Sequence, residues 1–164
     1  MGATKDALEQ AYAGEAKAAL RLKVYAEKAD EEGYPQIAKL FRVIARSEEI
    51  HGARALRVLK EIKSTEKNLE ESFQSEVGVA QVAYAAFVRE AEAEGNQGAV
   101  LHFSQSRDVE EGHGKLYKEA MNHLMEGRET SYYVCRICGY VADGVLPETC
   151  PVCGAPAAEF DAFE

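Results

Sequence analysis

Glu48-Glu49-Ile50-His51-Gly52, in the first half of the chain, returns sixty-two residues later as Glu110-Glu111-Gly112-His113-Gly114. On a helix, residues three apart lie on one face, so the outer Glu and the His of each copy can bind one cation. The intervening glutamates, Glu49 and Glu111, point roughly the opposite way. One copy alone would fit a solvated acidic face with a histidine on it. Two copies in register indicate a site for two metal ions.

The repeat extends beyond the metal-binding residue types. Under the same shift, Gly33 falls on Gly95 and Phe41 falls on Phe103. This pattern is typical of an internal duplication. Two such halves that face each other would bring the two Glu-x-x-His motifs together.

Length, charge and hydropathy limit what the chain can be. It has 164 residues, of which 46% are hydrophobic, enough for one core and a small second domain. A net charge of −9 without a basic stripe argues against nucleic acid as a partner. No apolar run approaches the roughly 20 residues of a membrane span, and the start lacks the apolar core of a signal peptide. We therefore expect no membrane association and a cytoplasmic location.

Four long helices are expected between about Thr4 and Glu126, where Ala, Leu, Glu and Lys dominate and apolar residues recur at spacings of three and four. Gly33 followed by Pro35 suits one helix end and the next helix start. Ser64 and Asn96 are suitable N-caps for two further helices. Residues 1–127 are therefore predicted to form a four-helix bundle.

Two more glutamates interrupt apolar helix faces. Glu15 stands between Tyr12 and Ala18, and Glu76 stands between Phe73 and Ala80. At the edge of the stripe they could reach water. Buried, four glutamates and two histidines would need cations to neutralise them. One Glu from each of two helices and a Glu-x-x-His from each of the others is the ligand set of ferritin-like carboxylate proteins, which favours iron or manganese, with iron first.

All four cysteines lie near the end of the chain, as two Cys-x-x-Cys-Gly motifs. They are Cys135, Cys138, Cys150 and Cys153. In a reducing compartment such a cluster indicates a tetrahedral metal site more often than two disulfides. The spacing alone fits a zinc ribbon, which is the commoner use of paired Cys-x-x-Cys motifs, or a single-iron site. We expect a small domain with short β-strands over residues 132–164, joined by a linker at 128–131.

The motifs together identify a family resemblance that covers nearly the whole chain. A carboxylate-rich bundle is followed by a segment from Tyr132 to Tyr140, Tyr-Tyr-Val-Cys-x-x-Cys-Gly-Tyr, and by Cys-Pro-Val-Cys-Gly-Ala-Pro from Cys150. This arrangement resembles rubrerythrin, as do Ala13-Gly-Glu15 and Asp108-Val-Glu-Glu111. The C-terminal part is similar to rubredoxin, which favours iron over zinc in the four-cysteine site, with zinc as a possible substitute.

The resemblance implies an enzyme: an oxidoreductase that reduces hydrogen peroxide to water in defence against oxidative stress. Electrons would pass from a reductase or a rubredoxin through the four-cysteine iron to an oxo- and carboxylate-bridged di-iron centre. Glu48 and Glu110 would be the bridging carboxylates. The implied di-iron ligands are Glu15, Glu48, His51, Glu76, Glu110 and His113, and the single iron would be held by Cys135, Cys138, Cys150 and Cys153.

The chain departs from the family pattern at two positions. Val79 stands where typical members have a second glutamate that moves on and off one iron, and Leu22 replaces a tyrosine. Tyr84, the matching tyrosine of the second half, is present and is a candidate to hydrogen-bond a ligand carboxylate. An ordinary core aromatic is the alternative for Tyr84.

The assembly and the activity each leave alternatives open. The short hinge after the fourth helix predicts that the four-cysteine domain of one chain serves the di-iron site of its partner, in a head-to-tail homodimer. The rival function is that of a ferritin-like ferroxidase that handles iron without dedicated peroxide turnover. An O2-responsive sensor or electron carrier is a third possibility, so the oxidant is either peroxide or O2.

Overall fold

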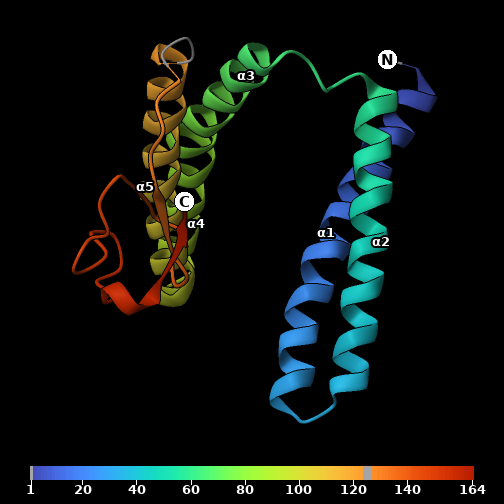
Figure 1. Cartoon of the computed structure of the whole chain (residues 1–164), viewed down its shortest axis with the longest axis horizontal. Coiled ribbons are helices and arrows are strands. Elements are labelled where there is room, and N and C mark those ends of the chain that lie inside the picture. Colours follow the sequence, from blue (N-terminus) through green and yellow to red (C-terminus); the bar gives the residue numbers. More distant parts are fainter. Residues whose placement is uncertain (1, 124–126) are drawn as a thin grey trace. The chain divides into compact units, whose positions relative to one another are not determined.

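The computed structural model describes residues 2–123 and 127–164 of the chain. Within it the chain forms two compact units, Met1–Lys63 and Ser64–Glu164. Each unit contains one antiparallel pair of long helices, and the second also contains a small sheet (Figure 1). No helix in the described ranges is both long and apolar enough to cross a membrane.

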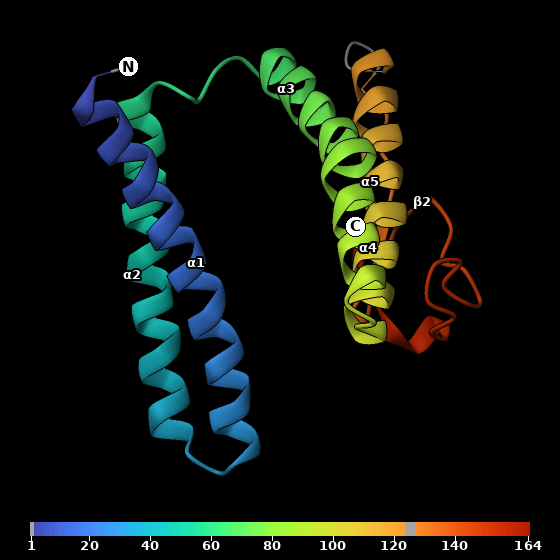
Figure 2. The ribbon, with the colours of Figure 1, turned by 180° about the vertical axis from the view of Figure 1, so that it is seen from behind.

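The first unit is a hairpin of α1 (Ala3–Glu31) and α2 (Pro35–Leu59), which run side by side (Figures 1 and 2). Gly33 has a φ of 80°, and the N–H of Tyr34 donates to the carbonyl of Ala29, which closes α1 in the way that a glycine at this position favours. Pro35 then starts α2. The predicted helix break is therefore confirmed.

The second unit begins with α3 (Thr65–Gly78), the π-helix η1 (Val79–Tyr84) and α4 (Ala85–Ala93), which together form the expected third helix. It packs against α5 (Gln97–Asn122). Ser64 accepts a hydrogen bond from the N–H of Lys67, as an N-cap does. Gly95, with a φ of 69°, repeats the role that Gly33 has in the first unit. The expected helix end near Glu126 lies outside the described residues.

Asn96 caps α5, because its side-chain oxygen accepts a hydrogen bond of 3.1 Å from the N–H of Ala99. Replacing Asn96 with alanine leaves that donor without its partner. We expect the free energy of unfolding to fall by about 1 kcal/mol. Thermal unfolding of the metal-free protein measures this. Asn96→Ser, which can still cap, should lose much less, and an equal loss for both variants would contradict the capping role.

The π-helix lies directly after Glu76 and contains Val79 and Tyr84. Inside an α-helix, such a wide turn occurs frequently at functional sites. The π-helix packs on α5, and its residue Ala80 is fully buried. The sequence did not predict this local change in hydrogen bonding.

The C-terminal domain has three short antiparallel strands in the order β2-β1-β3: β1 (Tyr132–Cys135), β2 (Val141–Asp143) and β3 (Phe160–Phe163). A 3-10 turn, η2 (Ala157–Glu159), precedes β3. In the central strand, Tyr133 pairs with Ala142 on one side and Ala162 on the other. The core of the domain consists of Cys135, Cys150 and Ala155.

The segment that leads into this sheet is held by ion pairing. Arg128 donates two hydrogen bonds, of 2.8 and 3.0 Å, to the carboxylate of Asp143 in β2. Thr130 donates a third, of 2.6 Å, to the same carboxylate. These bonds lower the pKa of Asp143, Thr130 contributing most. The expected linker, residues 128–131, is therefore fixed to the sheet. Glu126, which precedes it, lies outside the described residues.

Candidate metal centres

The first unit brings three predicted ligands together. Glu15 comes from α1, and Glu48 and His51 come from one face of α2. A ligand atom of each lies within 4.8 Å of the other two. His51 Nδ1 is 3.2 Å from Glu48 Oε2 and 3.8 Å from Glu15 Oε1. We call these three residues the first trio.

The second unit repeats this arrangement with the second trio, Glu76 from α3 and Glu110 with His113 from α5. His113 Nδ1 is 2.9 Å from Glu110 Oε2. The side chains of Glu110 and His113 are 23% and 27% exposed, so the second trio is half-buried. The structure thus places all six predicted carboxylate and imidazole ligands in two equivalent groups of three.

The glycine after each histidine lies against the glutamate of the neighbouring helix, where a Cβ would make ordinary van der Waals contact. A Cβ on Gly52 would meet the Cβ of Glu15 at 3.7 Å, and a Cβ on Gly114 would meet that of Glu76 at 3.9 Å. Both glycines are buried. The sequence repeat contained this pair of glycines, but only the structure shows that they lie against the glutamate of the neighbouring helix.

The glutamates between the motif residues point elsewhere, as predicted. Glu49 binds Lys23 at 2.6 Å and Arg46 at 2.9 Å. The Lys23 hydrogen bond, followed by that of Arg46, lowers the pKa of Glu49. Glu111 is exposed. Neither belongs to a trio.

The donor set of each trio fits a cation. In the metal-free chain, Glu15 and Glu48 share a hydrogen bond, which raises the pKa of Glu15 and lowers that of Glu48. Two neighbouring carboxylates share a proton because their negative charges repel each other. A bound cation would neutralise both carboxylates instead. A metal ion with bonds of about 2.1 Å brings its ligands to about 3–4 Å from one another, close to the separations found here. Each trio therefore offers two carboxylates and one imidazole to one ion.

Burial, followed by the hydrogen bond that protonated Glu76 donates to Glu110, raises the pKa of Glu76 from 4.5 to about 7. The folded, metal-free chain therefore holds this proton more tightly than the unfolded chain does. We expect the stability that this proton contributes to be complete below about pH 4.5 and to be lost as the pH rises through about 7. The melting temperature of the metal-free protein, measured from pH 5 to 8, should fall over this range. Glu76→Gln should flatten the profile; an unchanged profile in that variant would contradict the assignment.

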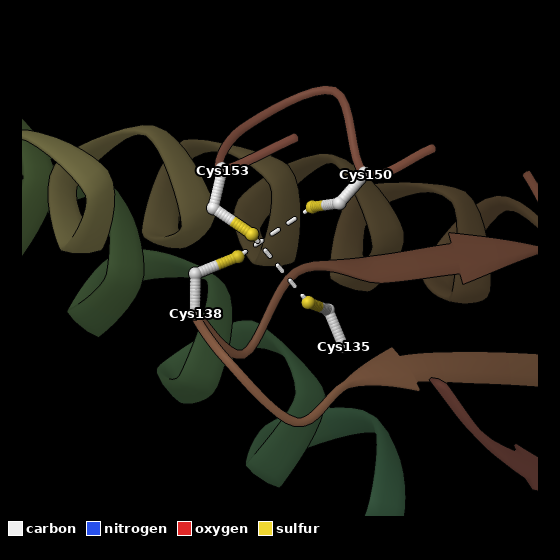
Figure 3. Close-up of side chains that lie close together, drawn as sticks. All are labelled: Cys135, Cys138, Cys150 and Cys153. Atoms are coloured by element: carbon white, nitrogen blue, oxygen red, sulfur yellow. Dashed lines mark hydrogen bonds between the residues drawn. The ribbon is translucent and has the colours of Figure 1, made fainter. Parts of the chain in front are cut away.

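The four cysteine sulfurs converge on one point (Figure 3). Cys135 Sγ is 3.7 Å from Cys153 Sγ, and Cys138 Sγ is 3.6 Å from Cys150 Sγ. A tetrahedral ion with metal–sulfur bonds of about 2.3 Å separates its thiolates by roughly 3.8 Å. All four cysteines are free, so the cluster fits a metal ion and excludes disulfides.

Backbone N–H groups in the two knuckles donate to the sulfurs. Burial alone would raise the pKa of Cys150, but the N–H groups of Cys153 and Val152 lower it below its usual value. The turns depend on Gly139 and Gly154, whose φ angles are 82° and 76°. Such N–H donors stabilise thiolate charge and tune the potential of a bound redox metal.

The comparisons with known proteins decide the family. The sequence profile of Rubrerythrin matches residues 6–121, and that of Rubrerythrin, rubredoxin-like domain, matches residues 133–161. The chain belongs to the rubrerythrin family. It is 32% identical to nigerythrin of Nitratidesulfovibrio vulgaris, a match that covers 99% of this chain and 88% of nigerythrin. It is 30% identical to rubrerythrin-2 of Clostridium acetobutylicum, covering 98% of this chain and 96% of that protein.

A solved structure agrees with this assignment. Fully reduced, all-ferrous nigerythrin superposes with a TM-score of 0.61 over 99% of this chain and 88% of nigerythrin. This rubrerythrin-family chain therefore has a di-iron domain and a rubredoxin-like domain with four cysteines. Family membership supports a di-iron oxidative-stress protein with oxidoreductase activity.

The positions at which the chain departs from the family pattern are half-buried. Val79 is the first residue of η1, and Leu22 lies in α1. Tyr84 packs its ring against Phe87 and Phe103, at centroid distances of 5.8 and 6.2 Å. Its place is therefore an aromatic cluster of the second unit, and its catalytic role stays a prediction.

Proposed function

We propose that this chain is a peroxidase that reduces hydrogen peroxide to two molecules of water, using two electrons and two protons. The proposal assigns the two trios to the di-iron centre and the four cysteines to the iron that supplies electrons. The observation that carries it is that one unit contains both the four-cysteine domain and the second trio. The domain contacts α5, the helix that contains Glu110 and His113. Storage of iron would not require a built-in electron donor.

When bound, a pair of iron ions supplies two electrons and acts as a Lewis acid toward the oxygens of the substrate. The residues of the two trios would hold and orient that pair. Glu48 and Glu110, each beside a histidine on the same helix face, would be the bridging carboxylates, as the family resemblance implies. Glu15 and Glu76 approach from the neighbouring helix at the glycine that follows each histidine.

Protons have three candidate sources: a ligand carboxylate, water and the hydroxyl of Tyr84. Glu76 is a half-buried carboxylate of the second trio; its raised pKa belongs to the metal-free chain, and bound iron would favour its ionised form. Tyr84 would have to leave its packing with Phe87 and Phe103 or donate through water. We therefore place it second to the carboxylate.

The four-cysteine domain lies on α5 of its own chain. A Cβ on Gly139, the residue after Cys138, would be 3.9 Å from Cγ1 of Val109, and Val109 is buried. Val109 precedes the proposed ligand Glu110. β2 also contacts α5, which supports an approach within one chain. The expected head-to-tail homodimer, in which the domain serves the partner chain, stays a prediction. We infer a short route from the knuckle to the second trio of the same chain.

Substitutions at Val109 test this route. Val109→Asp places a charge under the knuckle, so we expect the domain to separate from α5 and electron transfer between the iron sites to slow by at least about tenfold, since a buried unpaired charge costs several kcal/mol. Stopped-flow reoxidation of the four-cysteine iron measures the rate. Val109→Ile should retain the contact and the rate. An unchanged rate in the Asp variant, with normal iron content, would exclude this route.

Iron handling is the second candidate function, and Val79 favours it. Without a carboxylate there, the ligand set of four glutamates and two histidines is the simple ferritin-like one. The two functions differ under excess Fe(II) and O2. A ferroxidase continues to take up iron beyond the ions of its defined sites, whereas the peroxidase should stop at three per chain.

Peroxide turnover tests the proposal directly. The iron-loaded protein, supplied anaerobically with electrons by a reductase and rubredoxin pair, should consume peroxide catalytically and form water without O2. Turnover no faster than that of the reductase pair alone would contradict it. The physiological donor is proposed to be a reductase or a rubredoxin, the assembly a homodimer and the location the cytoplasm.

A further inference from the structure

The C-terminal domain lies along α5, with the knuckle at one end of the contact. A Cβ on Gly139 would be 3.9 Å from Cγ1 of Val109. At the other end, Asp143 lines a cavity together with Glu119 of α5. Val109 and Glu119 are ten residues apart, which is about 15 Å, or about three turns, of an α-helix. The domain therefore meets α5 at two well-separated points.

The end of the domain that is far from the knuckle is fixed by a clasp of three side chains, Arg128, Thr130 and Asp143. Arg128 donates to both carboxylate oxygens of Asp143, and Thr130 donates to one of them. Two parallel bonds from one guanidinium fix the direction of the pair as well as its distance. The N–H of Gly144 donates a further bond, of 2.8 Å, to the carbonyl of Ser131. The side chain of Asp143 is 15% exposed, so water competes little for it.

Arg128 also responds to the charge of α5. Its pKa is raised first by the hydrogen bond and the charge of Asp143, and to a smaller extent by the charges of Tyr132 and Glu119. Asp143 and Tyr132 belong to the sheet, whereas Glu119 belongs to the helix. The guanidinium is therefore attracted to both structures that the clasp brings together.

The clasp shortens the chain that connects the domain to α5. The helix ends at Asn122, and Arg128 is already bound to the sheet, so residues 123–127 are the whole connection. With the clasp open, the connection would extend to residue 131, directly before β1. Nine residues can span about 31 Å, against about 17 Å for five. An open clasp would therefore allow the knuckle to leave Val109.

We propose that Asp143 is a positioning residue for electron transfer within the chain. Through the clasp it holds the knuckle against Val109 of α5, the helix that contributes two residues to the second trio. The inference rests on the electron route proposed above and adds a condition to it, namely that the sheet is fixed at both ends. Asp143 belongs to neither trio nor to the four-cysteine cluster, so it acts only through the position of the domain.

Asp143→Ala removes all three side-chain bonds of the clasp. The effective concentration of a tethered group falls as about the −3/2 power of tether length, so lengthening from five to nine residues lowers it about 2.4-fold. In single-turnover stopped flow, we expect the peroxide-driven return of the thiolate–iron colour to slow by at least about twofold. The spectrum of the four-cysteine iron should not change, because the cysteines and their turns stay intact.

Asp161 offers a matched control, because it lies in β3, on the side of β1 opposite to β2. It pairs with Arg136 at 3.8 Å. Asp161→Ala should leave the rate of colour return unchanged. The reciprocal exchange Arg128→Asp/Asp143→Arg re-forms the ion pair and should recover most of the wild-type rate, which general damage to the fold would not allow.

Cleavage by trypsin gives a second measurement, which does not depend on the reaction. Trypsin can cut after Arg128 when the segment around it opens from the sheet. Asp143→Ala should therefore release the fragment of residues 129–164 several times faster than the wild type, and Asp161→Ala should not. Mass spectrometry of the products identifies this cut.

The two measurements separate the possible failures. Faster cleavage of Asp143→Ala with an unchanged rate of colour return would overturn the positioning role. Unchanged cleavage would show that the clasp does not hold the segment, and would overturn the proposal as well. If peroxide fails to restore the colour of the wild-type protein, the proposed function is refuted, while the cleavage rates still test the clasp.

Discussion

Replacing Cys135 with alanine should empty the four-cysteine site and unfold the C-terminal domain. Cys135 is 1% exposed and belongs to the small core formed with Cys150 and Ala155. A domain this small depends on its metal, and the free energy at stake is on the order of 10 kcal/mol. The thiolate–iron colour should disappear, and peroxide turnover with an external donor should fall to background. Absorption spectra and steady-state assays measure both effects.

Ile137→Ser is the matched control, because Ile137 lies in the same knuckle and is 62% exposed. It should retain the colour and the turnover. If Cys135→Ala kept peroxide turnover at the wild-type rate with the same donor, the four-cysteine iron would not be the route for electrons. Chelation of the metal from the wild-type protein should reproduce the effect of the cysteine variant.

Replacing Glu110 with alanine should abolish the iron pair. Glu110 lies 2.9 Å from His113 and shares a hydrogen bond with Glu76, so its removal deprives the second trio of its central carboxylate. Loss of groups that only support a ligand lowers metal affinity by about 10- to 100-fold, and loss of the ligand should exceed about 100-fold. Iron analysis should show one ion per chain, in the four-cysteine site, and peroxide turnover should stop.

The neighbouring Glu111 provides the control for this change. It is exposed and belongs to no trio, so Glu111→Ala should leave iron content and turnover unchanged. A full iron complement in Glu110→Ala would show that the motif binds no metal. Equal losses in both variants would indicate a general effect of charge on α5.

Local chemistry made much of the fold predictable from the sequence. The breaks at Gly33, Ser64 and Asn96 follow from turn geometry and capping, which depend on a few neighbouring residues. The trios could likewise be predicted, because i and i+3 residues share a helix face and the motif occurs twice. The contact of Gly52 with Glu15 and of Gly114 with Glu76 was missed, although the repeat of the two glycines in register was visible.

Other features depend on tertiary packing, which periodicity does not contain. The contact between Gly139 and Val109 joins segments thirty residues apart, and nothing in either segment alone indicates it. The π-helix after Glu76 reflects a choice between two hydrogen-bonding patterns that are close in energy. The position of Tyr84 among phenylalanines also required the structure.

The central claim is that peroxide draws electrons from the four-cysteine iron through the di-iron centre, and single-turnover stopped flow tests it most directly. The iron-loaded protein is reduced anaerobically until its thiolate–iron colour bleaches, and is then mixed with stoichiometric peroxide or, separately, with O2. Fast return of the colour with peroxide and slow return with O2 is the predicted result. Slow return with both oxidants would contradict the account and favour iron handling.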